Sequence, residues 1–73
     1  MYRVQVNPTA FADGCDEIVG SIEEAAFLAR CVGVKSIFRF YDGLWFLYAS
    51  EEDMIKDQGC QRMEMGSIEE VAE

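Results

Sequence analysis

The stretch that decides the fold is residues 34–50, which read VKSIFRFYDGLWFLYAS. Two runs of aromatic and β-branched residues, 34–41 and 44–50, flank the dipeptide Asp42-Gly43. Such runs are typical of strands, and Asp-Gly between them favours a two-residue type I′ turn. The pattern therefore predicts a β-hairpin.

A two-residue turn places Tyr41 opposite Leu44 and so fixes the register of this hairpin. The predicted pairs are Phe40 with Trp45, Arg39 with Phe46, Phe38 with Leu47 and Ile37 with Tyr48. One face would then be continuously apolar and suited to a helix: Val34, Phe38, Phe40, Trp45, Leu47 and Ala49. The other would mix charged and aromatic side chains: Lys35, Ile37, Arg39, Tyr41, Leu44, Phe46 and Tyr48. This second face is too aromatic for free solvent and too charged for an ordinary core.

On the N-terminal side of the hairpin, the pattern predicts a strand, a long connection and a helix. Apolar and polar residues alternate over 2–6, which is typical of a half-buried strand, and Pro8 follows. Residues 8–20 contain several turn residues and are interpreted as a connection. Ser21 and Glu24 form a capping box, and apolar residues at helical spacing continue to Gly33, which favours a helix over 22–32.

On the C-terminal side, acids at 51–53 after Ser50 begin a second predicted helix, over 51–58, and Gly59 ends it. Residues 61–65 alternate again and predict a fourth strand. Residues 66–71 match residues 20–25 at five of six positions, and we interpret them as a second capping box at the start of a last helical turn.

The predicted order is strand, helix, strand, strand, helix, strand, in one domain over residues 1–73. This is the ferredoxin-like βαββαβ arrangement of the α+β class, an antiparallel sheet with its helices on one face. If the short second helix is only a turn, the fold reduces to a three- or four-stranded sheet with one main helix.

The composition excludes several kinds of chemistry. With 73 residues and no histidine, the chain has little room for a cleft and lacks the commonest general base and the imidazole metal ligand. The three cysteines, Cys15, Cys31 and Cys60, form no Cys-x-x-Cys pair. We expect a protein that is not an enzyme and that binds no cofactor and no metal. No signal-peptide or membrane-spanning pattern occurs, so we expect a cytoplasmic protein.

The charge is large and unevenly placed. The net charge is -8, with 14 acidic and 6 basic residues. Residues 1–41 carry five acids and four bases, a net of -1, whereas residues 42–73 carry nine acids and two bases, a net of -7. Such a charge opposes direct binding of nucleic acid, whose affinity comes largely from Lys and Arg. It favours a basic protein partner, and it also keeps a small domain soluble.

Candidate partner-binding residues follow from this distribution. The carboxylates are Glu51, Glu52, Asp53, Asp57 and Glu64, and the aromatic anchors are Phe27, Tyr41, Phe46 and Tyr48. Phe27 is a candidate because the helical projection places it among charged residues, opposite the apolar arc. Alternatively, the 8–20 connection folds over it.

In size, acidity and lack of catalytic machinery, the chain resembles small phage-encoded anti-defence proteins, including anti-CRISPR proteins and other DNA mimics. The resemblance is carried by the acidic residues 42–73. It implies an inhibitor or decoy whose carboxylates occupy the basic nucleic-acid-binding site of a partner protein in the host cytoplasm. Carboxylates can take the place of phosphates because Lys and Arg bind either group.

Two other hypotheses stay open. The mixed hairpin face could dimerise with a second copy of the chain, as a structural or regulatory module, because burial is the usual remedy for an apolar surface. That face also resembles the open sheet on which RNA-recognition domains stack bases, but 44–48 lacks the basic-aromatic motif of that family and the net charge opposes it.

Overall fold

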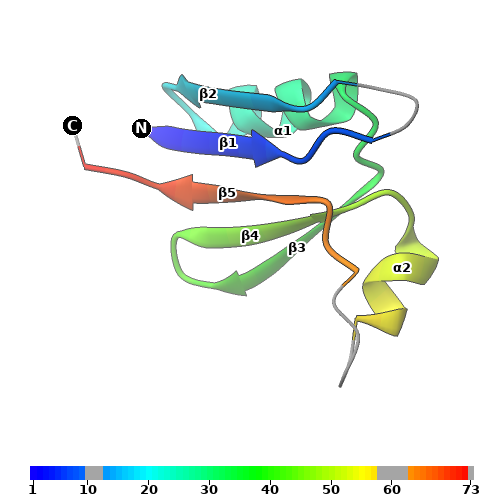
Figure 1. The fold of residues 1–73 in the computed structure, drawn as a ribbon. Helices are drawn as coiled ribbons and strands as arrows, with labels where there is room; N and C mark the ends of the chain where they lie inside the picture. Colours follow the sequence, from blue (N-terminus) through cyan, green and yellow to red (C-terminus); the bar gives the residue numbers. More distant parts are fainter. Residues whose placement is uncertain (10–12, 58–62, 73) are drawn as a thin grey trace.

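The computed structural model describes residues 1–9, 13–57 and 63–72, in which a five-stranded antiparallel sheet is accompanied by two helices (Figure 1). The elements follow in the order β1 (Tyr2–Val6), β2 (Cys15–Val19), α1 (Ile22–Cys31), β3 (Ser36–Tyr41), β4 (Leu44–Tyr48), α2 (Glu51–Lys56) and β5 (Gly66–Glu70). The strands are arranged β2-β1-β5-β4-β3. The predicted α+β class is confirmed, whereas the predicted ferredoxin-like order is wrong, because the sheet gains β2 and uses a different last strand.

The first difference is β2, which lies within the predicted 8–20 connection. It pairs antiparallel with β1, from Tyr2 opposite Val19 to Val6 opposite Cys15. Its sequence, Cys-Asp-Glu-Ile-Val, does not alternate and carries two adjacent acids, so its own residues give little strand signal. Pairing is helped by the Arg3 guanidinium, which donates to both carboxylate oxygens of Asp16 at 2.9 and 2.8 Å.

The second difference concerns the repeated pentapeptide Gly-Ser-Ile-Glu-Glu, which forms a helix start at 20–24 but strand β5 at 66–70. At the first copy the predicted capping box is present: the Glu24 N–H donates to Ser21 Oγ, and the Gly20 N–H donates to the Glu24 carboxylate. At the second copy, β1 and β4 flank the segment on both sides and Ile68 is fully buried. Tertiary pairing therefore outweighs the local capping preference.

The predicted strand over 61–65 is also wrong for residues 63–65, which are the part of it that the structure describes. Residues 63–65 have no strand structure, and 61 and 62 lie outside the described residues. The predicted helix over 51–58 is confirmed as α2, which ends at Lys56; residue 58 lies outside the described part of the chain.

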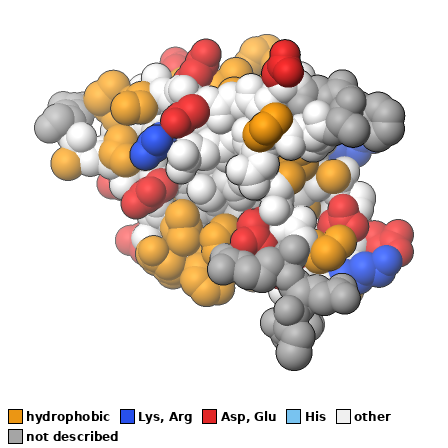
Figure 2. Space-filling view, viewed as in Figure 1, with side chains coloured by type: hydrophobic (Ala, Val, Ile, Leu, Met, Phe, Trp, Pro, Cys, Tyr) orange, Lys and Arg blue, Asp and Glu red, His pale blue; other side chains and the backbone are white. Residues whose placement is uncertain are grey.

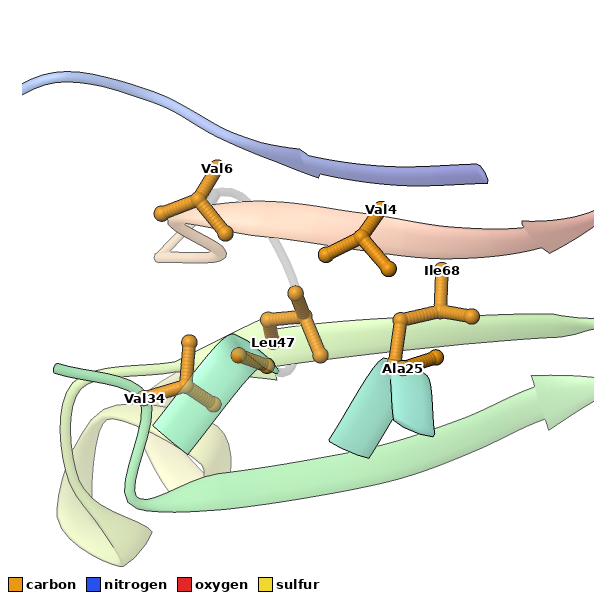
Figure 3. Close-up of a cluster of buried hydrophobic side chains, with 7 residues drawn as sticks. Val4, Val6, Ala25, Val34, Leu47 and Ile68 are labelled. Atoms are coloured by element: carbon orange, nitrogen blue, oxygen red, sulfur yellow. The ribbon is translucent and has the colours of Figure 1, made fainter. Parts of the chain in front are cut away.

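The core lies between α1 and one face of the sheet, which we call the inner face (Figures 1 and 3). Ala25 and Ala29 are fully buried on α1, and their small side chains let the helix lie close to β1 and β2. The other buried members of this core cluster come from the strands and from the end of the α1–β3 connection: Val4, Val6, Val34, Leu47 and Ile68.

The β3–β4 hairpin is present, but its register differs by one residue from the prediction along most of β3. The observed pairs include Phe38 with Phe46 and Arg39 with Trp45, and the register shifts between Arg39 and Tyr41. A type I′ turn needs a positive φ at both central residues. Only Gly43 has one (φ 81°), so the turn is of another type and the strands accommodate it with an irregularity.

This shift exchanges the two faces of β3, because successive strand residues point to opposite sides. Ile37 pairs with buried Leu47 and so shares the inner face. Phe38 pairs with Phe46 on the opposite side, which we call the outer face. The predicted assignment of Phe38 and Phe40 to the core and of Ile37 and Arg39 to the other face is therefore wrong. The predicted assignment of the β4 side chains to the two faces agrees with the observed register for Leu44, Trp45, Phe46, Leu47 and Tyr48.

Candidate protein-binding surface

Four aromatic side chains form a cluster on the β3–β4 hairpin, three of them exposed and Phe46 half-buried: Phe38, Phe40, Tyr41 and Phe46, which we call the aromatic patch. The rings of Phe40 and Phe46 stack with centroids 4.8 Å apart, and the ring of Tyr41 meets that of Phe40 edge-on at 5.4 Å. Phe38, Phe40 and Tyr41 are 46, 56 and 58% exposed. In Figure 2, hydrophobic side chains gather over this hairpin. Contiguous apolar surface of this kind marks interaction sites.

Sequence reasoning placed Tyr41 and Phe46 in this patch but missed Phe38 and Phe40. The strong alternation of β3 identifies a strand, yet it cannot say which of its two faces is covered. The register shift near the turn decides which face is covered. This shift accompanies a turn in which Gly43 has a positive φ and Asp42 does not, which differs from the predicted type I′ turn. The patch is consequently more aromatic, and less charged, than the predicted mixed face.

Carboxylates border the patch at the turn. Glu69 lies opposite Leu44, and the Glu70 N–H donates to the Gly43 carbonyl at 2.7 Å, so the acidic end of β5 lies beside the turn. Asp42 adds a third carboxylate there and accepts a hydrogen bond from Arg39. Tyr41, Asp42, Gly43, Glu69 and Glu70 line one open hollow together. None of these three acids was a predicted site residue.

A second acidic group lies at the opposite end of the hairpin. Glu51 and Glu52 are exposed in the first turn of α2, which follows directly from the end of β4. Glu52 pairs with Lys56 at 2.8 Å, and the Asp53 N–H donates to Ser50 Oγ. Because β4 runs five residues from the turn to this end, the two groups are separated by about 15 Å of strand, along which the patch lies.

Tyr48 and Asp57 join α2 to the outer face. Tyr48 is 2% exposed, and its hydroxyl donates to the Asp57 carboxylate at 2.5 Å. Leu47 points into the core, so Tyr48 points to the outer face and anchors α2 there. Tyr48 is thus buried by the chain itself, and the expectation that it offers an exposed anchor is wrong.

The remaining predicted residues are dispersed. Phe27 is 70% exposed on α1, so the described part of the 8–20 connection leaves it uncovered, but it lies on the helix that packs against the inner face, away from the patch. Asp53, Asp57 and Glu64 are half-buried. The structure therefore brings Tyr41 and Phe46 together and places Glu51 and Glu52 at one end of them.

Ionisation is perturbed at the β1–β2 pair. The Arg3 guanidinium, which donates to the carboxylate, lowers the pKa of Asp16 below its usual value of 3.8. Partial burial, followed by the nearby Glu17 carboxylate, raises the pKa of the Cys15 thiol. A raised thiol pKa opposes formation of the nucleophilic thiolate.

Comparison of the chain with protein-family models, curated proteins and solved structures finds no match. In the part of the chain that the structure describes, no three His, Cys, Asp or Glu side chains converge on a possible metal position. Neither of the two described helices has the length and apolar character needed to cross a membrane.

Proposed function

We propose that the protein is a non-enzymatic binding protein, of the inhibitor or decoy kind, which occupies the basic nucleic-acid-binding site of a partner protein. The observation that carries the proposal is the aromatic patch with carboxylates at both ends. Exposed aromatic rings supply the apolar anchors of protein interfaces. Flanking carboxylates steer the surface towards Lys and Arg and discriminate against acidic partners.

The mode of action follows from charge spacing. Carboxylates at the turn (Asp42, Glu69, Glu70) and on α2 (Glu51, Glu52) are held apart by a rigid sheet rather than by a flexible tail. A basic channel that normally binds consecutive phosphates can bind both groups at once, with the patch between them excluding water. An anti-defence role, such as inhibition of a CRISPR effector complex, is one setting in which such a decoy would act.

The test is capture by the immobilised chain of proteins from a nuclease-treated bacterial lysate, with elution by a salt gradient. We expect nucleic-acid-binding proteins, released between low and moderate salt, because exposed charge interactions are screened there. Added duplex DNA should release the same proteins. Captured proteins without a nucleic-acid site, or retention that salt and DNA leave unchanged, would refute the decoy mechanism.

Two matched pairs of variants localise the surface. Phe38→Ser with Phe40→Ser should abolish capture, whereas Phe27→Ser removes an even more exposed ring on α1 and should not. Glu51→Gln with Glu52→Gln should lower the salt concentration needed for elution. Glu17→Gln with Glu23→Gln makes the same change of charge away from the patch and should not.

A second candidate function is a homodimeric interaction module. The observation that favours it is the position of β3 at the edge of the sheet, where an exposed strand with aromatic side chains is a ready template for pairing. Light scattering at high micromolar concentration measures the molar mass and therefore distinguishes a dimer from a monomer. A dimer that Phe38→Ser with Phe40→Ser converts to a monomer would support it, and a wild-type monomer would exclude it.

A further inference from the structure

The two edges of the sheet differ in their charge. β2 and β3 are the edge strands (Figure 1), and the outward backbone groups of an edge strand can pair with another chain. β2 carries two adjacent acids, Asp16 and Glu17, and charged side chains on an edge oppose such pairing. β3 carries no acid, and Arg39 is its one charged residue. Of the two edges, β3 is therefore the one that its own side chains leave open to a further strand.

The side chains along β3 also select the strand that would cover it. Phe38 and Phe40 are 46 and 56% exposed, so a covering strand must bring apolar side chains to the outer face. A strand from a basic protein would meet Lys35 and Arg39 with like charge, which destabilises a sheet. β3 of a second copy meets the apolar condition with the same two rings, and Asp42 directly after it supplies an acid.

We propose that β3 pairs antiparallel with β3 of a second copy, so that two five-stranded sheets form one continuous sheet. Antiparallel neighbours of this kind are related by a twofold axis perpendicular to the sheet, so the outer faces of both copies lie on the same side. The aromatic patches then meet at the axis, and each copy completes the patch of the other. This inference rests on the second candidate function, and it adds the strand, the direction and the register of the pairing.

Two rules select the register. Residues opposite each other point to the same face, so the axis passes through a residue and not between two. An axis at Phe38 pairs residues 36–40 and an axis at Arg39 pairs 37–41, whereas any other position pairs three residues of β3 or fewer. An axis at Arg39 places two guanidinium groups opposite each other, which destabilises a sheet. The axis therefore passes through Phe38.

The ends of this interface are complementary in charge. With the axis at Phe38, Lys35 lies opposite Tyr41 and next to Asp42 of the second copy. Lys35 is exposed. Asp42 accepts from Arg39 through Oδ1, and its side chain is 95% exposed, so Oδ2 is accessible to a second cation. By symmetry, the contact between lysine and carboxylate occurs at both ends.

The direct test uses the wild-type protein at millimolar concentration, in a sample where half of the chains carry ¹³C and ¹⁵N and the other half carry neither. Isotope-filtered NOEs in this sample come only from contacts between copies. We expect them between the two Phe38 residues, and between Ile37 of one copy and Arg39 of the other. Filtered NOEs that connect other residues, or none, would overturn the pairing.

Disulfide trapping gives a second decision. Opposite residues of an antiparallel pair have Cα atoms about 4.5–5.5 Å apart, within the roughly 4.4–6.8 Å that a disulfide spans. In a background in which the three native cysteines are serine, Phe38→Cys should therefore form a linked dimer on mild oxidation. Phe40→Cys is the matched control, because its two copies lie about 13 Å apart along the strands and should stay unlinked. Both variants are oxidised at a concentration at which they are dimeric, and equal yields would overturn the register.

Charge reversal tests the two ends. Lys35→Glu places a carboxylate beside Asp42 at both ends and should raise the dissociation constant of the dimer about tenfold. Adding Asp42→Lys should restore most of the lost affinity. Arg30→Glu makes the same change of net charge on α1 and should leave the constant near the wild-type value. Equal effects of Lys35→Glu and Arg30→Glu would refute the end contact and with it the register.

The outcome is separable from those of the two candidate functions. A dimer whose filtered NOEs lie elsewhere refutes this pairing and leaves the homodimeric module standing. A monomer at millimolar concentration refutes both the pairing and the module. The decoy function is decided separately, by capture of nucleic-acid-binding proteins.

Discussion

Substitution of Gly66 by alanine tests the reasoning about β5 most directly. A Cβ built at Gly66 lies 2.1 Å from the Gln5 carbonyl oxygen and 2.8 Å from Val6 Cα, both backbone atoms of β1. Contacts shorter than 3.0 Å are essentially never seen, so β1 and β5 would have to separate by about 0.9 Å, the difference between 3.0 and 2.1 Å. This movement would strain the pairing at the centre of the sheet.

Overpacking of this kind costs about 1–3 kcal/mol, and the backbone contacts place Gly66→Ala near the upper end. A domain of 73 residues has a free energy of unfolding of about 4–11 kcal/mol. At about 4–8 °C per kcal/mol, a loss of 2–3 kcal/mol lowers the melting temperature by roughly 10–20 °C. Thermal unfolding monitored by circular dichroism measures this shift.

Gly20 provides the matched control, because it begins the same pentapeptide. A Cβ at Gly20 meets nothing within 4 Å, and its φ is not positive. Gly20→Ala should therefore stay within about 1 kcal/mol of the wild type, on the stabilising side through the reduced entropy of the unfolded chain. Equal melting temperatures for the two variants would refute the close approach of β1 and β5.

Three further predictions concern the core, one exposed ion pair and one side-chain hydrogen bond. Leu47→Ala should lower the free energy of unfolding by about 2–5 kcal/mol in urea, because Leu47 is fully buried; a smaller change would show a loosely packed centre. The Asp16 pKa, measured by NMR titration, should lie below 3.8 and rise towards that value in Arg3→Gln. Since the pKa of Asp16 is lowered in the folded state, the ion pair stabilises the fold fully above the unfolded-state pKa, and this contribution disappears as pH falls through the folded-state pKa. In Asp16→Asn, the free energy of unfolding should therefore depend less on pH in the acid range. Tyr48→Phe removes the donor to Asp57 and should cost about 1.5–3 kcal/mol and speed amide exchange in α2; unchanged exchange would show that the bond does not hold the helix.

Local signals predicted the elements whose own residues carry the information. The alternation of 2–6 corresponds to β1, the capping box at Ser21 begins α1, and the acids after Ser50 begin α2. The position of Phe27 among charged helix residues marked it as a candidate anchor, but it left open whether the 8–20 connection covers the ring. These features depend on contacts within a few residues.

The parts that could not be predicted depend on distant residues. β2 is a strand because β1 offers it a partner and Arg3 pairs with Asp16, not because of its own pattern. β5 is a strand because two other strands enclose it, and its pentapeptide is a helix start elsewhere. The aromatic patch depends on a turn geometry that shifts β3 by one residue relative to β4. Because the sequence predicts the unshifted register, it places Phe38 and Phe40 in the core.

The place of β5 in the sheet also has a consequence for folding order. β1 with β2 and β3 with β4 are hairpins that can form early from neighbouring residues, but β5 is the strand that joins them. Val6 pairs with Gly66 across 60 residues, so this closure bears the largest entropic cost of the sheet. During synthesis, the edges of β1 and β4 that pair with β5 stay unpaired until residues 66–70 leave the ribosome. In that interval these edges are exposed to pairing with other chains.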